Sequence, residues 1–266
     1  MIYVVPSLKA KEKLQSEGKA WAESQGFTYV LRHQRTIQDL MDEYGEDFLV
    51  YSSRGPQIDR PEGSHFFSLN MAELRIQNLR KGQRDHLLEA LIGRGSSHQP
   101  LSVLDCTCGF GADAAVASFG LPAGSRIDAL EVSPLLEAVT SWGFSHFVHK
   151  KDDVTAALRR ISLRHGDYRD YLLSDEGPVY DVLYFDPMFQ RPVEASCQFQ
   201  PVRAIMEHGG LTRDLIERAL QKARRRVVIK ERDFRQLCRD FPEVTLYGGK
   251  YSRIGYAVLE CDSWKK

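Results

Sequence analysis

Hydrophobic and polar residues alternate along the chain in short blocks that predict an α/β protein. From residue 101 onward, segments with helical spacing such as 134–147 and 211–223 separate five apolar runs of strand length, SVLD, RIDALE, ISLRHGD, YDVLYFD and RVVIKE. Strands that alternate with helices are typical of βαβ units and a parallel sheet. Only six residues separate the last two predicted strands, 243–247 and 254–260. Because six residues cannot hold a crossover helix, we expect this pair to be antiparallel.

The first sixty residues have the pattern of a separate, small α/β unit. Ser7 is a candidate N-cap for a first helix, and Thr36 with Asp39 resembles a capping box for a second. Residues 52–64 are rich in Gly, Pro and Ser, so they are the best candidate for a linker. We therefore predict two domains, residues 1–60 and 65–266. Three strands are expected in the first of them, at residues 2–5, 27–31 and 47–51.

The composition is that of a globular chain without net charge. The 266 residues include 36 basic and 36 acidic side chains and are 42% hydrophobic, which excludes disordered and low-complexity classes. No stretch approaches the ~20 apolar residues of a membrane span, and the N-terminus lacks the pattern of a secretory signal. The odd number of cysteines, five, agrees with a reduced, cytoplasmic chain. Cys106 and Cys108 lack a second Cys/His pair at zinc spacing, so we predict a tight turn and no metal site.

A glycine-containing turn follows the predicted strand SVLD. Asp105 ends this strand, and Gly109 and Gly111 follow it, where the absence of side chains lets a ligand approach the backbone. A G-x-G pair alone is a weak signal, because ordinary strand–helix turns contain it too. Ala114 stands where a dinucleotide-binding motif has its third glycine. An acid at residue 105 disfavours a pyrophosphate but suits a cationic amino group.

Three further predicted strands also end in acidic residues, Glu131, Asp167 and Asp186. The carboxyl ends of parallel strands meet at one edge of the sheet, where open α/β proteins bind their ligands. Glu131 stands 20 residues after Gly111, where a carboxylate can accept both hydroxyls of a ribose. Asp167 can accept a hydrogen bond from an adenine amine. Asp186 begins the tetrad D-P-M-F, and four acidic strand ends together predict a ligand site more strongly than any one of them.

Taken together, these motifs resemble the class I S-adenosylmethionine-dependent methyltransferases. The D-P-M-F tetrad resembles the D/N-P-P-Y/F tetrad of enzymes that methylate exocyclic amines on nucleobases. Over roughly residues 65–260, the segments DCTCGFGADA, ALEVSPLL, YFDPMF, RVVIKERDF and NMAELRIQNLRKG resemble the J-type 16S ribosomal RNA guanine-N2 methyltransferases. The chain departs from that family at Ala112, where an arginine is expected, at Gln190, where a proline is expected, and in RPVEASCQFQP, which has few lysines.

The resemblance implies a Rossmann-like class I methyltransferase fold, with a mainly parallel seven-stranded sheet and an antiparallel last strand. The small N-terminal α/β unit precedes it. The resemblance also implies S-adenosyl-L-methionine as the cofactor and ribosomal RNA or the small ribosomal subunit as the partner. The implied cofactor-binding residues are Asp105, Gly109, Gly111, Ala112, Asp113, Glu131, Val132, Asp167, Tyr168 and Asp186.

Several of these residues have more than one interpretation. Asp113 either reaches the amino-acid end of the cofactor or only favours the helix dipole. Val132 either packs on the adenine or belongs to the ordinary core. For catalysis, the Asp186 side chain and the Pro187 carbonyl would accept the two N–H bonds of a guanine amine, and Phe189 would stack on an extruded base.

A local surplus of basic residues indicates an RNA-facing surface. Residues 203–235 contain ten basic and five acidic side chains in a chain of zero net charge. Lys230 and Arg232 follow the strand RVVI at the predicted binding edge, and Arg75 and Arg80 belong to a second basic group. We predict that these four residues contact RNA, whereas the other basic residues also fit a solvated helix face.

Three other functions remain open at this point. The chain could methylate DNA or a small amine, and it could bind S-adenosylmethionine without catalysis, although an intact D-P-M-F tetrad argues against that. A nicotinamide dehydrogenase is disfavoured by Asp105 and by the missing third glycine. The pattern predicts no oligomeric state.

Overall fold

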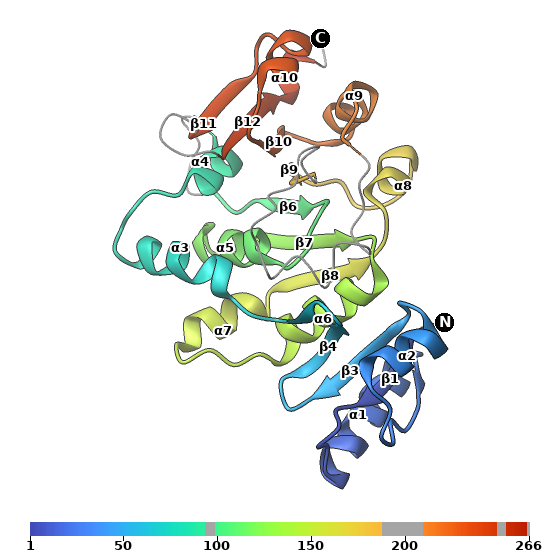
Figure 1. Ribbon diagram of the computed structural model, residues 1–266. Coiled ribbons are helices and arrows are strands. Elements are labelled where there is room, and N and C mark those ends of the chain that lie inside the picture. The colour runs from blue at the N-terminus through green and yellow to red at the C-terminus, as the bar shows by residue number, and fades with distance from the viewer. Residues whose placement is uncertain (94–98, 188–209, 249–253, 265–266) are drawn as a thin grey trace. The chain divides into compact units, whose positions relative to one another are not determined.

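The computed structural model describes residues 1–93, 99–187, 210–248 and 254–264, which form two compact units (Figure 1). The described residues of unit 1 are Met1–Ser68 and Ser133–Phe147. Unit 2 comprises the described residues of Leu69–Val132, Val148–Pro192 and Glu207–Lys266. The domain boundary at residues 60–65 stays a prediction.

Unit 1 contains a five-stranded sheet in the order β2-β1-β3-β4-β5. Strand β1 pairs in parallel with β2 and β3, and the chain then turns back twice to give antiparallel β4 and β5. The three strands predicted in the first sixty residues are therefore confirmed. The strands are β1 (Tyr3–Pro6), β2 (Thr28–Tyr29), β3 (Phe48–Ser52), β4 (Gly55–Arg60) and β5 (Gly63–Phe66).

The predicted linker at residues 52–64 is wrong, because this segment forms β4 and most of a hairpin. Pro56 pairs only with Tyr51 of β3, since the pairing of β5 begins at Gln57. A proline that lacks an N–H is tolerated in a strand where no second neighbour requires that donor. The glycines and prolines of this segment therefore lie in turns and at a strand end within the sheet, and they do not form a linker.

The helices of unit 1 are α1 (Glu12–Ser24), α2 (Ile37–Tyr44) and α6 (Pro134–His146). The capping box of α2 is confirmed, because Thr36 Oγ1 accepts from the Asp39 backbone N–H and the Asp39 carboxylate accepts from the Thr36 N–H. The predicted N-cap at Ser7 is wrong. The Ser7 N–H donates to the Tyr51 carbonyl and its own carbonyl closes a turn with Ala10, so α1 begins only at Glu12.

Unit 2 contains a seven-stranded sheet in the order β11-β12-β10-β9-β6-β7-β8. The neighbours from β10 to β8 all pair in parallel, whereas β12 is antiparallel to both β10 and β11. The predicted parallel sheet with an antiparallel last strand is thus confirmed. The strands are β6 (Ser102–Asp105), β7 (Arg126–Glu131), β8 (Ile161–His165), β9 (Val182–Phe185), β10 (Arg226–Glu231), β11 (Thr245–Gly248) and β12 (Gly255–Glu260).

Helices cover both faces of this sheet, which is the three-layer arrangement expected for βαβ units. Leu183 and Phe185 of β9 pack in one core with Leu220 of α9, while Tyr184 between them donates to Asp113 of α5. Because successive side chains of a strand point to opposite faces, α9 and α5 lie on opposite sides. The helices of unit 2 are α3 (Asn70–Arg80), α4 (His86–Ile92), α5 (Ala112–Gly120), α7 (Asp152–Leu158), α8 (Tyr168–Leu173), α9 (Arg213–Lys222) and α10 (Arg235–Asp240). Among the described helices, none has the length and apolarity needed to cross a bilayer.

The carboxyl ends of β6, β7, β9 and β10 meet at one edge of the sheet because these four strands are parallel and successive in space. This edge receives three of the four acidic strand ends that the sequence singles out, Asp105, Glu131 and Asp186. The fourth, Asp167, lies beyond the end of β8 and is the N-cap of α8. The fold therefore places the candidate chemistry in one region of unit 2.

Candidate active site

The turn between β6 and α5 has the backbone conformation that its glycines allow. Gly109 has φ 54° and Gly111, the N-cap of α5, has φ 75°. A Cβ atom added to Gly109 would meet no atom nearer than the Thr107 carbonyl oxygen, at 4.0 Å. The left-handed backbone therefore requires glycine, and the space beside it is open to a ligand.

Asp105, at the end of β6, is a buried carboxylate with few protein partners. Its residue is 2% exposed, and its Oδ1 accepts from the Thr107 N–H at 3.1 Å. Burial raises the pKa of Asp105 well above its usual range, and the Thr107 hydrogen bond and the Lys230 charge offset this only in part. In the described part of the chain, no Lys, Arg or His forms an ion pair with Asp105. The amino group of a ligand would supply the missing positive charge.

Glu131, at the end of β7, is tied to the glycine turn. Its Oε2 accepts from the Gly109 N–H at 2.8 Å, and its residue is 8% exposed. The neighbouring Cys108 N–H donates to the Leu130 carbonyl, so β7 and the turn are joined at two points. This pairing holds a carboxylate next to the left-handed turn, as the predicted ribose contact requires.

The residues predicted to flank the adenine lie after β7 and after β8, and each has a protein partner. Asp167 caps α8 by accepting from the Arg169 N–H, and it also forms an ion pair with the Arg169 guanidinium at 2.7 Å. Tyr168 is buried in the core, where its ring and that of Phe185 form a T-shaped contact. Val132 is partly exposed, and its carbonyl oxygen lies 3.0 Å from His165 Nε2. Their contacts with the cofactor remain predictions.

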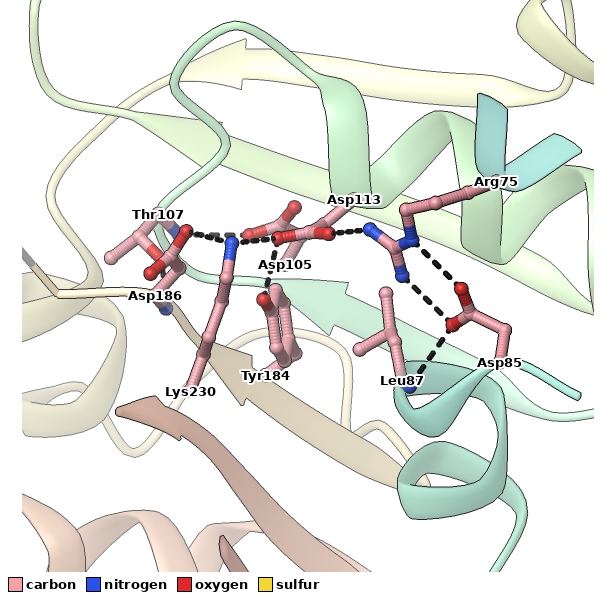
Figure 2. Close-up of polar contacts among 9 residues, drawn as sticks. All are labelled: Arg75, Asp85, Leu87, Asp105, Thr107, Asp113, Tyr184, Asp186 and Lys230. Carbon is pink, nitrogen blue, oxygen red and sulfur yellow. Dashed lines mark hydrogen bonds and ion pairs between the residues drawn. The ribbon is translucent and has the colours of Figure 1, made fainter. Parts of the chain in front are cut away.

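Asp186 follows β9 and is held from two sides (Figure 2). Its N–H donates to Thr107 Oγ1 at 2.6 Å, and its Oδ2 accepts from Lys230 Nζ at 2.7 Å. Lys230 also donates to Asp113 Oδ2, at 2.8 Å, and so bridges two carboxylates. Tyr184 donates its hydroxyl to the same Asp113 oxygen, at 2.7 Å.

The far side of this cluster is closed by Arg75 of α3. Its guanidinium forms two 2.8 Å hydrogen bonds with Asp85, the N-cap of α4, and a third bond with Asp113 (Figure 2). Burial raises the pKa of Asp113, but Lys230 and Arg75 lower it more, so Asp113 stays charged. Burial lowers the pKa of Lys230, but Asp113 and Asp186 raise it more, so the lysine stays protonated.

Two of the residues predicted to contact RNA, Lys230 and Arg75, form ion pairs within this cluster. The side chains of Lys230 and Arg75 are 13% and 25% exposed, and their charges are paired inside the site. The sequence analysis does not predict this pairing, although Asp113 and Asp186 are among its candidate site residues. Arg80 pairs with Asp153 and lies over the Phe119 ring, whereas Arg232 is exposed just after β10.

The remaining predicted site residues are Ala112, Pro187 and Phe189. Ala112 is the first residue of α5 and is partly exposed beside the turn, and Pro187 is partly exposed after Asp186. Phe189 lies outside the described residues.

Comparison with known proteins identifies the family. The family described as "Putative SAM-dependent methyltransferase" matches residues 63–254. The Bacillus subtilis protein YpiP is 27% identical over 230 residues, which are 86% of this chain and 88% of that protein. Ribosomal RNA small subunit methyltransferase J from Marinobacter nauticus is 28% identical over 71% of this chain and 66% of its own length. The same-named protein from Dechloromonas aromatica is 27% identical over 72% of this chain and 76% of its own length.

A solved structure confirms the fold. The SAM-dependent methyltransferase NGO1261 from Neisseria gonorrhoeae matches with a TM-score of 0.63 at 18% sequence identity, covering 97% of this chain and 95% of that one. The site also fits S-adenosylmethionine, because the buried Asp105 carboxylate needs a cation and Glu131 stands beside an open glycine turn. These residues would hold the amino group and the ribose, and the cofactor supplies a methyl group on a sulfonium. The chain belongs to the SAM-dependent methyltransferase family, has a class I fold that resembles the J-type ribosomal RNA enzymes, and uses S-adenosyl-L-methionine as its cofactor.

Proposed function

We propose that this methyltransferase methylates the exocyclic amino group of a guanine in small-subunit ribosomal RNA. The observation that carries the proposal is the Asp186 carboxylate, which stands at the binding edge of the sheet and is fixed by Thr107 and Lys230. Thr107 Oγ1 accepts from the Asp186 backbone N–H and Lys230 donates to Oδ2, so among the described residues none donates to Oδ1. Asp186 can therefore accept a hydrogen bond from a substrate.

The chemistry of the acceptor explains why such an oxygen is needed. The lone pair of a guanine amine is shared with the ring, so the nitrogen is a poor nucleophile. An ionised Asp186 only accepts hydrogen bonds, and Pro187 has a carbonyl but no N–H. If these two groups accept the two N–H bonds of the amine, the lone pair is localised and directed at the methyl group. The proton that the amine loses on methylation can pass to the Asp186 carboxylate.

The names of the relatives support RNA as the substrate class. Two relatives that align with about 70% of this chain are named ribosomal RNA small subunit methyltransferase J. Arg232, exposed at the carboxyl end of β10, supplies a cation beside the proposed acceptor site. The stacking of Phe189 on an extruded base belongs to this proposal as well.

Two alternatives make different predictions in one assay. A DNA or small-amine methyltransferase uses another acceptor, and a non-catalytic binding protein uses none. The experiment offers the purified full chain radiolabelled S-adenosylmethionine with small subunits from a strain that lacks this protein, large-subunit RNA, single-stranded DNA or guanosine. We expect label only in small-subunit RNA, recovered as N2-methylguanosine after digestion.

Preferential labelling of DNA or of free guanosine would contradict the proposed substrate. Failure to label any acceptor, with cofactor binding intact, would favour the binding protein. The variant Asp170→Asn is a matched control, because Asp170 is an exposed carboxylate on α8. It should label small-subunit RNA as well as the wild type.

A further inference from the structure

Lys230 occupies an unusual position for a lysine that ends a strand. Its Nζ lies 2.7 Å from Asp186 Oδ2 and 2.8 Å from Asp113 Oδ2, and its side chain is 13% exposed. The register explains this placement, because Ile229 of β10 pairs in parallel with Phe185 of β9. The next residues along the chain, Lys230 within β10 and Asp186 just after β9, therefore lie side by side.

We propose that Lys230 is a positioning residue of the methyl-transfer site, which binds Asp186 Oδ2 and keeps this carboxylate ionised, so that Oδ1 accepts from the acceptor amine. The inference rests on the proposed function, because the acceptor amine is the partner assigned to Asp186. Lys230 itself is not assigned a contact with the substrate. Its effect on the reaction passes through the carboxylate.

The charge balance of the cluster makes the lysine necessary. The linked ion pairs contain two cations, Arg75 and Lys230, and three carboxylates, Asp85, Asp113 and Asp186. Among the described residues, Arg75 is shared between Asp85 and Asp113 and forms no ion pair with Asp186. Lys230 is thus the cation that the described residues bring to Asp186, and its removal leaves the buried Asp113 and the half-buried Asp186 with one arginine between them and Asp85.

Several other groups act on the charge of Asp186. Burial is the largest influence and raises its pKa, Lys230 lowers it, and the result is a pKa of about 6. Without the ammonium, burial and the neighbouring acids would raise it further. Below this pKa, Asp186 carries a proton and is no longer an acceptor-only group. The charged and titratable groups that face Asp186 are Lys230 and Glu231 of β10, Asp113 of α5, Asp105 of β6 and Tyr184 of β9.

The test measures the titration of Asp186 directly and needs no RNA. The full chain is labelled with ¹³C at the aspartate carboxyl carbons, and the Asp186 signal is identified by its loss in Asp186→Asn. In Lys230→Met, we expect the titration midpoint to rise by ~1–3 pH units above that of the wild type, as for the loss of a close opposite charge. Lys150→Met, at an exposed lysine, should leave it unchanged.

For a second variant we expect the titration midpoint of Asp186 to shift in the opposite direction. Asp113→Asn removes a neighbouring negative charge, so the titration midpoint of Asp186 should fall. A purely structural disturbance gives no reason for the two variants to shift the midpoint in opposite directions. If Lys230→Met does not fold, Lys230→Gln replaces it, with the same expected rise. An unchanged midpoint in the folded Lys230 variant, or a rise in Asp113→Asn, would overturn the proposal.

Methyl transfer to small-subunit RNA should follow the same titration. The rate in the wild type should rise with pH through the midpoint of Asp186, and in Lys230→Met this limb should move to higher pH while S-adenosylmethionine affinity is kept. A uniform loss of rate at every pH would contradict the positioning role. If the wild type transfers no methyl group to this RNA, the proposed function fails, while the carboxyl titration still decides whether Lys230 controls Asp186.

Discussion

Replacing Asp186 by asparagine changes one carboxylate oxygen into an NH2 group and keeps the shape of the side chain. The structure determines which way the amide turns. Lys230 has three donors and no acceptor, and its Nζ lies 2.7 Å from Asp186 Oδ2. The amide oxygen must therefore face Lys230, which leaves the NH2 group facing the acceptor amine. Two donors then oppose each other where the wild type has a donor and an acceptor.

The expected loss follows from this geometry. Lys230 keeps a hydrogen bond to the amide oxygen and its ion pair with Asp113, so the cluster is not left with an unpaired cation. The substitution therefore destabilises mainly the transition state of methyl transfer. We expect the rate of methyl transfer to fall by ~10²–10³-fold, or ~2.7–4 kcal/mol, which is the loss typical of one preorganised transition-state contact.

Single-turnover methyl transfer at saturating cofactor, with unmodified small-subunit RNA, measures this loss of rate without a contribution from product release. Calorimetry should show that Asp186→Asn still binds S-adenosylmethionine, with a modest decrease at most. Asp170→Asn, an exposed Asp→Asn change on α8, should match the wild type in both assays. If Asp186→Asn transfers the methyl group at the wild-type rate, the D-P-M-F segment is only a turn and the amine-methylation reasoning is refuted.

Three further predictions address the cofactor, the RNA and the stability of the cluster. Asp105→Ala and Glu131→Ala should each cost ~1–3 kcal/mol of S-adenosylmethionine binding, or ~5–150-fold, and unchanged calorimetric affinity in both would contradict the assigned contacts. Arg232→Ala should reduce the salt dependence of RNA binding by about one unit of slope, whereas an unaltered slope would mean no phosphate contact. Arg75→Met should lower the free energy of unfolding in urea by about 3 kcal/mol, because it removes one partner of a mostly buried ion-pair network. Arg84→Met, at a side chain that is 85% exposed, is its control and should change stability by less than ~0.5 kcal/mol.

The sequence contains enough information for the sheet and for its binding edge. Each strand of unit 2 has a short apolar run, and the acids that end these runs need no tertiary information to be noticed. Their meeting at one edge follows from the parallel arrangement alone. The sequence predicts Asp105, Glu131, Asp167 and Asp186 for this reason. The structure brings Asp105, Glu131 and Asp186 to that edge, whereas Asp167 lies beyond the end of β8 and caps α8.

The role of the basic residues could not be predicted in the same way. Lys230 is 44 residues from Asp186 and 117 from Asp113, and a lysine at a strand end has the same local pattern whether it meets RNA or a buried acid. What distinguishes the two cases is the pairing of β9 with β10, and this pairing cannot be predicted without knowing the order of the strands in the sheet. The ion pair of Arg75 with Asp113 was missed for a related reason, because it joins α3 to α5 across unit 2.

The hairpin of unit 1 shows a different limit. The composition of residues 52–64 is that of a linker, but Gly55 and Pro56 lie where β4 has a neighbour on one side only. Local preference allowed either structure, and pairing with β3 decided between them.

The most direct test of the central claim is mass mapping of the modified nucleosides in small-subunit ribosomal RNA. RNA from a strain that lacks this protein is compared with RNA from the same strain expressing the wild type, Asp186→Asn or the control Asp170→Asn. We predict that one N2-methylguanosine is absent without the protein, returns with the wild type and with Asp170→Asn, and stays absent or strongly reduced with Asp186→Asn. An identical set of modified nucleosides in all four samples would contradict methylation of this RNA by the protein.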